Sequence, residues 1–344
     1  MDPVTHLLTG ACLGRSGLNR KTGLATLTLT LAAEAPDLDV ISYFRGSIAG
    51  LQHHRGFTHS LLGIPLVGIV VVAAVYGIYR FRSRSGWRPR LAPRWGLLFG
   101  YGCLGAAVHL LQDFTNNYGV RPFDPFYCKW YSGDLVFIID PLMLLALFLG
   151  LVLPSLFGLI SEEVGAKKGR FRGAGGARFA LVCLAALISV RAFEHARAVT
   201  ALQSLTYHGE DAVRVSAFPN PFNFFSWNGV VETRDFFELL PVNADAGEVD
   251  PHNRAVVRYK PQETAVTLAA KKSYLGRVYL DWAQYPLVHQ SKLEGNRYLV
   301  TFTDLRFSSA HALRRRLANP LTGYVVLDSA LRVEQQGMGP PNPD

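Results

Sequence analysis

Apolar residues form long runs in the first half of the chain and alternate with polar residues in the second half. The runs at 61–79, 96–111, 135–160 and 177–190 are long enough, or nearly so, to cross a bilayer, which needs about 20 residues per helix. Two shorter runs, 4–14 and 22–33, are rich in Gly, Ala and Thr. They predict a closely packed helical pair, either thinly spanning or re-entrant. The first half therefore predicts an α-helical polytopic membrane domain.

Beyond residue 200 the pattern changes to short alternating segments. Such segments stand at 255–259, 277–280 and 298–302, with turn sequences at 294–296 and 321–323. Alternation over four to eight residues between turns is typical of strands. We therefore expect a multipass membrane domain over residues 1–195, a smaller β-rich (α+β) soluble domain over 200–336, and a flexible tail at 337–344.

The charge of the chain orients the membrane domain. The formal net charge is +9, which by itself also suits nucleic-acid binding, but the cations gather between the apolar runs. Fourteen of them occupy three alternate connections: Arg15, Arg20, Lys21, Arg80, Arg82, Arg84, Arg88, Arg90, Arg94, Lys167, Lys168, Arg170, Arg172 and Arg178. The intervening connections, 34–59 and 113–134, hold only Arg45, Arg55, Arg121 and Lys129. By the positive-inside rule the first set is cytoplasmic, so the β-rich domain is extracytoplasmic, and the partners are membrane lipids rather than nucleic acid.

Ionisable residues stand where membrane helices normally exclude them. Asp2 and Pro3 suit a helix start, which leaves His6 in the first turn. Pro36 ends the second apolar run among carboxylates, and His109 and Asp113 share one helix face at a spacing of four. The residues of this kind that we single out in this half are His6, Glu34, Asp37, Asp39, His54, His59, His109, Asp113, Asp134 and Asp140.

In the charge-derived topology all these residues map to the outward side of the membrane. Each has an ordinary explanation alone, as a helix cap or as an interfacial imidazole. Together they exceed what hydrogen bonding near lipid requires, so they predict a metal site. Imidazole and carboxylate ligands without thiolate suit zinc, and also manganese or iron. A bridged pair of ions is a further option with so many ligands.

The motifs carry a resemblance to a known family. They are Asp2-Pro3-x-Thr5-His6, Pro36-Asp37-x-Asp39, His54-Arg55-Gly56-x-Thr58-His59-Ser60, His109-x-x-x-Asp113 and Asp140-Pro141. In this order they resemble the YdjM-like family of bacterial inner-membrane proteins, described as metal-dependent hydrolases, over about residues 1–195. The resemblance implies metal ligands at His6, Asp37, His54 or His59, His109 and Asp113.

Other residues receive supporting roles. Asp39 is our candidate general base, and Arg55 is a candidate for steadying an anionic substrate, although an interfacial arginine also anchors lipid headgroups. Thr5 and Thr58 are expected to cap helices or to hold a ligand from behind. Glu34, Asp134 and Asp140 are left between a role around the metal and a purely structural one.

These observations favour a membrane-bound hydrolase that activates water with a divalent metal, zinc first, at the outer face of the membrane. Its location suits a lipid or lipid-linked (phospho)ester. The alternative is a non-enzymatic membrane protein that uses the same cluster for metal or proton transport, or as a structural metal site. Transport needs polar groups through the whole bilayer, and the apolar runs are nearly free of charge.

Overall fold

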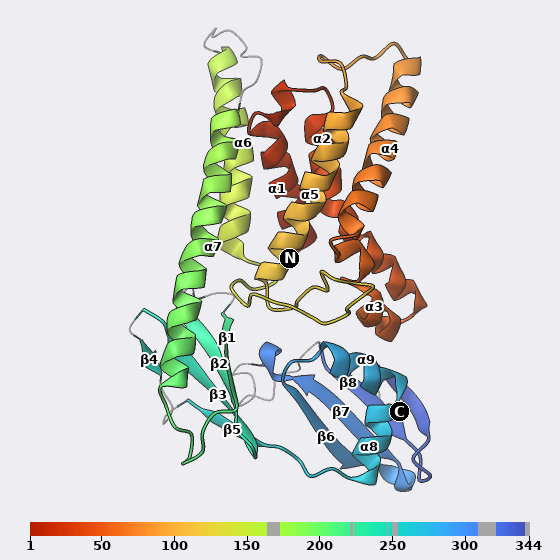
Figure 1. Ribbon diagram of the computed structural model, residues 1–344, viewed down its shortest axis with the longest axis vertical. Helices are drawn as coiled ribbons and strands as arrows, with labels where there is room; N and C mark the ends of the chain where they lie inside the picture. Colours follow the sequence, from red (N-terminus) through yellow and green to blue (C-terminus); the bar gives the residue numbers. More distant parts are fainter. Residues whose placement is uncertain are drawn as a thin grey trace. The chain divides into compact units, whose positions relative to one another are not determined.

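The chain forms two compact units. The computed structural model describes residues 1–163, 173–220, 223, 225–245, 247–249, 254–308 and 321–340. One unit comprises Met1–Asp39 and Arg55–Ala192, and the other comprises Val40–His54 and Phe193–Asp344. The first is helical and the second contains two antiparallel sheets (Figure 1). The expected fold class, a helical membrane domain followed by a β-rich domain, is confirmed.

A close helical pair opens the first unit. α1 (Pro3–Arg15) and α2 (Ala25–Glu34) are joined through the short helix η1 (Leu18–Arg20). A Cβ atom added to Gly10 would lie 2.6 Å from the carbonyl oxygen of Leu29. One added to Gly14 would lie 2.5 Å from the Cα atom of Thr26. Only glycine allows such an approach, which is the packing that the small residues of these runs predict.

Three helices are long and apolar enough to cross a membrane within the described residues: α4 (Gly63–Arg84), α5 (Trp95–Thr115) and α7 (Ala174–Gln203). In α6 (Pro141–Glu163) the apolar part is shorter, Pro141–Pro154. The apolar run at 135–160 therefore forms a helix that begins at Pro141, six residues after the start of the run. Asp140 explains the start, because its carboxylate accepts hydrogen bonds from the amides of Leu142 (3.0 Å) and Met143 (3.1 Å).

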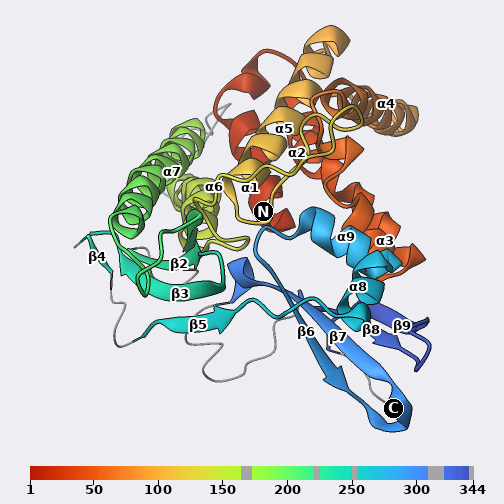
Figure 2. The same cartoon turned by 60° about the horizontal axis from the view of Figure 1, so that its bottom comes forward.

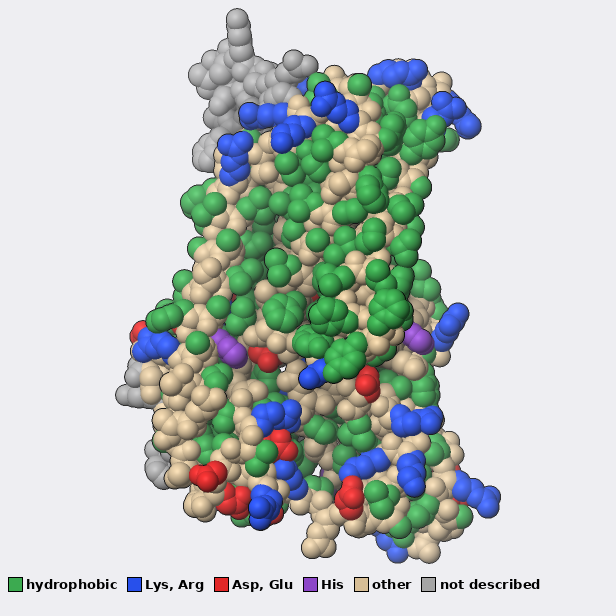
Figure 3. Space-filling view, in the orientation of Figure 1, with side chains coloured by type: hydrophobic (Ala, Val, Ile, Leu, Met, Phe, Trp, Pro, Cys, Tyr) green, Lys and Arg blue, Asp and Glu red, His purple; other side chains and the backbone are tan. Residues whose placement is uncertain are grey.

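Basic residues lie at one end of these helices. Hydrophobic side chains cover much of the face of the helical unit seen in Figure 3, and Lys and Arg gather at the end where α4 is joined to α5. The opposite ends of the same two helices are the start of α4 and the end of α5, where His59 and Asp113 lie. Of the last basic connection, residues 164–172 lie outside the described part of the chain.

An excursion from the first unit folds with the second. The 3-10 helix η2 (Ala35–Arg45) leads to α3 (Ser47–His53), and residues 40–54 belong to the second unit. The Gln52 side chain accepts a hydrogen bond from the Tyr274 hydroxyl (2.6 Å), and Ser47 Oγ accepts one from the Met338 amide (3.3 Å). At the base of the excursion, the Arg55 amide donates to Asp39 Oδ2 (2.8 Å).

Two antiparallel sheets make up the second unit (Figure 2). The first sheet has the order β1-β2-β3-β4, with β5 also paired to β3; its strands are β1 (Arg214–Pro219), β2 (Ser226–Glu232), β3 (Phe236–Asn243), β4 (Glu248–Val249) and β5 (Val256–Tyr259). The second sheet has the order β6-β7-β8-β9, with strands β6 (Pro286–Lys292), β7 (Tyr298–Asp304), β8 (Gly323–Leu327) and β9 (Val333–Met338). Fully buried Ala198 and Leu202, near the end of α7, pack with Trp227 of the first sheet.

Two short helices, α8 (Ala265–Lys272) and α9 (Tyr274–Trp282), lie between the sheets in the sequence. The strand expected at 277–280 is wrong, because this segment is part of α9. Ser273 begins the helix by accepting a hydrogen bond from the Gly276 amide (3.0 Å), and the buried residues Leu275, Val278, Tyr279 and Trp282 have helical spacing. The expected tail at 337–344 also begins too early, because β9 extends to Met338; residues 341–344 lie outside the described part.

Candidate metal centre

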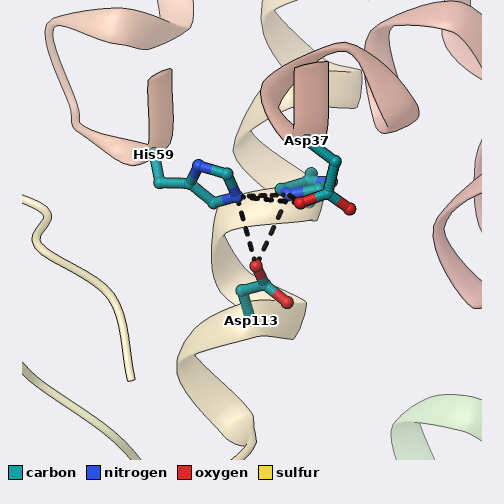
Figure 4. A group of neighbouring side chains, drawn as sticks. Asp37, His59 and Asp113 are labelled. Atoms are coloured by element: carbon teal, nitrogen blue, oxygen red, sulfur yellow. Dashed lines mark hydrogen bonds and ion pairs between the residues drawn. The ribbon is translucent and has the colours of Figure 1, made fainter. Parts of the chain in front are cut away.

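Four ionisable side chains from three segments of the helical unit meet at one place (Figure 4). Asp37 comes from η2, directly after buried Pro36 has followed α2, and His59 comes from η3 (Phe57–His59). His109 and Asp113 lie one turn apart on α5. His59, His109 and Asp113 are fully buried, whereas the Asp37 side chain keeps 13% of its exposure.

Distances within this group have the scale of a metal coordination shell. The Nε2 atoms of His59 and His109 are 2.9 Å apart. From His59 Nε2 the distances to Asp37 Oδ1 and Asp113 Oδ2 are 3.2 and 3.3 Å, and from His109 Nε2 they are 3.6 and 3.5 Å. In a tetrahedral site with bonds of about 2.0–2.1 Å, neighbouring ligand atoms lie about 3.3 Å apart. The four side chains therefore have the right spacing for one ion.

Hydrogen bonds behind the imidazoles determine which nitrogen faces the centre. His109 Nδ1 lies 2.7 Å from the carbonyl oxygen of Ala33, which can only accept a hydrogen bond. His59 Nδ1 lies 3.1 Å from Asp39 Oδ2, and the same oxygen accepts from the Thr58 hydroxyl at 2.9 Å. In the neutral ring a proton on Nδ1 leaves Nε2 as an acceptor. When neutral, both rings therefore turn the lone pair of Nε2 toward the carboxylate oxygens.

The two oxygens of Asp113 have different surroundings. Oδ2 faces the imidazoles and is buried without a hydrogen-bond partner. Oδ1 lies 3.1 Å from Arg55 Nη2 and 3.2 Å from His6 Nε2, and it accepts a 3.3 Å hydrogen bond from Asn116 Nδ2. The amino group of Met1 also contacts Oδ1. Donors on one oxygen hold the carboxylate so that the other points into the centre.

His6 stands beside the four-residue group rather than within it. Its ring stacks on His109 with the centroids 3.8 Å apart, and its Nδ1 lies 3.2 Å from Gln112 Oε1. The Gln112 amide nitrogen in turn donates to the Thr9 hydroxyl (3.0 Å). His6 therefore reaches the centre through Asp113.

Arg55 is buried, and both of its terminal nitrogens make polar contacts. Its Nη1 donates to Asn116 Oδ1 (3.1 Å) and to the Gly119 carbonyl (3.2 Å), and its guanidinium lies 4.7 Å from the centroid of the Tyr118 ring. Arg55 adopts a left-handed backbone conformation, with φ of 56°, which is uncommon outside glycine. These contacts favour a role in positioning Asp113 over direct contact with an anionic substrate.

Burial and charge act on the carboxyl groups at the exposed side of the centre. Burial opposes ionisation of Asp37, but a hydrogen bond from His59, which requires a proton on His59 Nε2 in the metal-free protein, and then positive charge on His109 and His59 hold the pKa of this carboxyl below its ordinary value. Glu34 shows the opposite result. Burial, followed by the negative charges of Asp37 and Asp2, raises the pKa of Glu34 to about 7.

The remaining residues singled out in the sequence have structural contacts. Thr5 donates to the Asp2 carboxylate, which caps α1 (amide to Oδ1, 3.0 Å). Asp140 caps α6 and lies 3.8 Å from Arg191, and Asp134 has a left-handed backbone with φ of 54°. His54 follows α3 in the second unit, so its role as a ligand stays a prediction.

Sequence reasoning missed Asn116 and Gln112. Asn116 is fully buried, accepts from the Tyr118 amide (2.8 Å), and connects Arg55 to Asp113. Gln112 is 3% exposed and holds His6. The available signal was their position, because an uncharged amide at the end of an apolar run also costs free energy to bury unless it is hydrogen-bonded, although less than a charged group does.

Comparison with known proteins gives a consistent picture. A protein of Bacillus subtilis (strain 168), described as the uncharacterized protein YfhP, is 26% identical over 154 residues. The match covers 42% of this chain and 44% of that relative, so the chain spans less than half of its length. No solved structure matches the chain. The model of the YdjM inner membrane protein family matches residues 1–198, which include every residue of the centre described above. The chain therefore belongs to the YdjM inner membrane protein family.

Proposed function

We propose that this protein is a membrane-bound, metal-dependent hydrolase. One observation carries the proposal: two imidazole nitrogens and two carboxylate oxygens converge in a buried place, and in neutral rings the hydrogen bonds behind the imidazoles leave these four atoms as acceptors. Such a group of acceptors is stable only around a cation. The ligands would be Asp37, His59, His109 and Asp113.

A divalent ion held there supplies a Lewis acid and lowers the pKa of water. The protein's own groups fix the ligands: Ala33 and Asp39 orient the two imidazoles, while Arg55, His6 and Asn116 hold the far oxygen of Asp113. Asp37 is the partly exposed ligand. Water and substrate would therefore reach the centre from the side on which Asp37 lies. Because Asp39 Oδ2 lies beside His59 Nδ1, on the side of the ring away from the centre, Asp39 fits an orienting role better than that of general base.

Apolar residues beside the centre support a lipid or lipid-linked ester as the substrate. The amide of Leu61, two residues after His59, donates to the Pro122 carbonyl (2.9 Å) and so joins two segments of the helical unit. Both segments expose apolar side chains, among them Leu61 itself and, at 85% exposure, Phe126. Exposed apolar groups next to membrane-spanning α4 favour contact with acyl chains. The charge asymmetry of the connections supports an outer-face location.

The direct test measures metal and hydrolysis together. Purified protein should contain divalent metal in a stoichiometric amount. It should also cleave a phosphoester or a carboxylic ester that is presented in mixed micelles. His109→Ala should weaken metal binding and abolish hydrolysis, because it removes a fully buried imidazole ligand that has no exposed alternative. His53→Ala is the matched control, since this imidazole is exposed on α3. If wild-type protein holds metal but does not cleave phosphoester, carboxylic ester or peptide substrates, the proposal of a hydrolase is rejected.

A structural metal site is the second candidate, and one observation favours it. Four protein ligands close a tetrahedral zinc site, which is the arrangement of structural zinc. In that case His109→Ala should lower thermal stability sharply, because the binding free energy is then folding free energy. In the hydrolase, bilayer burial and helix packing keep the variant folded.

A further inference from the structure

Glu34 is a carboxylate beside the centre that the ligand set does not use. It is the last residue of α2, and it directly follows Ala33, whose carbonyl holds His109. Its Oε2 atom is buried and has no hydrogen-bond partner. A buried carboxylate oxygen normally has at least one donor, so this oxygen is available to another group.

The neighbours of Glu34 identify its place in the centre. Its carboxyl is influenced by the negative charges of Asp37, on η2, and Asp2, before α1, and by the positive amino group of Met1. The other acidic residues here are engaged: Asp39 accepts from Arg55, Thr58 and His59, and Asp113 is held by Arg55 and Asn116. Glu34 Oε2 is therefore a carboxylate oxygen that none of these contacts uses, and its carboxyl is near enough to partly exposed Asp37 for the two charges to interact.

We propose that Glu34 is the proton-transfer residue of this centre. The inference rests on the proposed hydrolysis. The carboxylate takes a proton from the attacking water as the water oxygen bonds to the scissile phosphorus or carbonyl carbon. It returns that proton to the leaving oxygen as the ester bond breaks, so no net proton is gained or lost. One carboxyl group can perform both steps because it ends in the state in which it began.

The raised pKa of Glu34 is compatible with this role. An effective acid–base group has a pKa near the working pH, and burial together with Asp37 and Asp2 raises that of Glu34 to about 7 in the metal-free protein. A cation bound by Asp37 offsets one of these negative charges, and burial, the largest cause, remains. The rate of hydrolysis should therefore rise with pH through an inflection between the ordinary value of 4.5 and about 7.

The test compares Glu34→Gln and Glu34→Asp with the wild type. Glu34→Gln should keep its bound metal, lose about 10²–10⁴-fold in rate, and lose the rising limb of the pH profile. Glu34→Asp keeps a carboxyl group and should recover part of both the rate and the limb. Loss of bound metal in Glu34→Gln would overturn the inference, because Glu34 would then be a ligand. An unchanged rate and pH profile would overturn it as well.

Thermal unfolding of the metal-free proteins gives a readout independent of activity. The folded protein holds the Glu34 proton more tightly than the unfolded chain does, so the wild type loses stability as the pH rises from about 4.5 toward 7. Glutamine cannot ionise. Glu34→Gln should therefore unfold at a higher temperature than the wild type at pH 8 and at the same temperature at pH 4. Equal midpoints at both pH values would contradict the buried setting on which the inference depends. Wild-type protein that binds metal but hydrolyses nothing would instead reject the proposed function.

Discussion

Asp39→Asn distinguishes an orienting residue from a general base. In the wild type, Asp39 Oδ2 lies 3.1 Å from His59 Nδ1 and accepts from the Arg55 amide and the Thr58 hydroxyl. The amide oxygen of asparagine can still accept these bonds, so the segment should stay folded. What is lost is the negative charge behind His59. Hydrogen bonds to charged groups are worth about 1.5–3 kcal/mol and neutral ones about 0.5–1.5 kcal/mol, so the ligand loses about 1–1.5 kcal/mol of support.

That loss should appear as weaker metal binding. A difference of about 1.4 kcal/mol is tenfold in Kd, and replacement of a group behind a metal ligand typically costs 10–100-fold in affinity. Competition with a chelator of known affinity, in detergent, measures it directly. Thr58→Val is the comparison variant: it removes a hydroxyl that donates to Asp39 and lies 3.1 Å from His59 Nδ1, but it leaves the charge of the carboxylate, so its Kd should change by less. Asp39→Asn protein with unaltered metal affinity and no hydrolysis would refute this reasoning and restore Asp39 as the base.

Three further predictions follow from the same contacts. His6→Ala should reduce metal affinity less than His109→Ala does, because His6 acts through Asp113; isothermal titration of both variants would reveal an equal loss if His6 were a ligand. Reporter fusions after Arg88 and after Thr206 should show the first site to be cytoplasmic and the second extracytoplasmic, and cytoplasmic activity of both would contradict the charge-derived topology. Gly105→Val should destabilise the protein by about 1–3 kcal/mol and lower metal content, since a Cβ at this position would lie 2.7 Å from Ala32 Cβ and 3.1 Å from the Ala33 nitrogen. Gly100→Val, where no atom lies within 4 Å of the added Cβ, should be neutral in the same thermal scan.

The sequence was sufficient to predict the helical half and its polar end, because the relevant signals are local. Asp2 caps α1 and Pro3 is its first residue, as expected from the preference of these residue types for a helix start. The spacing of four between His109 and Asp113 places both on one face of α5. The membrane-spanning runs depend on composition alone. For the same reason the alternating segment at 298–302 was correctly expected as a strand, now β7.

Two features depended on contacts that the sequence does not display. The segment 277–280 alternates like a strand over four residues. However, Ser273 caps a helix, and the buried residues Leu275 and Trp282, before and after this segment, continue the helical spacing of its apolar positions. The roles within the centre depend on which carboxylate lies in front of an imidazole and which lies behind it. Asp37 and Asp39 are two residues apart on η2, and only the fold places one toward His59 Nε2 and the other toward His59 Nδ1.

The identity of the metal determines which of the two candidate functions the four ligands permit. Zinc bound tetrahedrally by Asp37, His59, His109 and Asp113 has no open position, so hydrolysis with zinc requires Asp37, the partly exposed ligand, to yield its place or the shell to expand. Manganese or iron prefers more ligands, and the same four residues then leave positions for water and substrate. Asp37→Ala should therefore abolish activity with manganese or iron by weakening binding. With zinc, Asp37→Ala should leave a three-ligand site that still holds metal and retains hydrolysis. A zinc protein that unfolds on this substitution would indicate that the closed shell is structural.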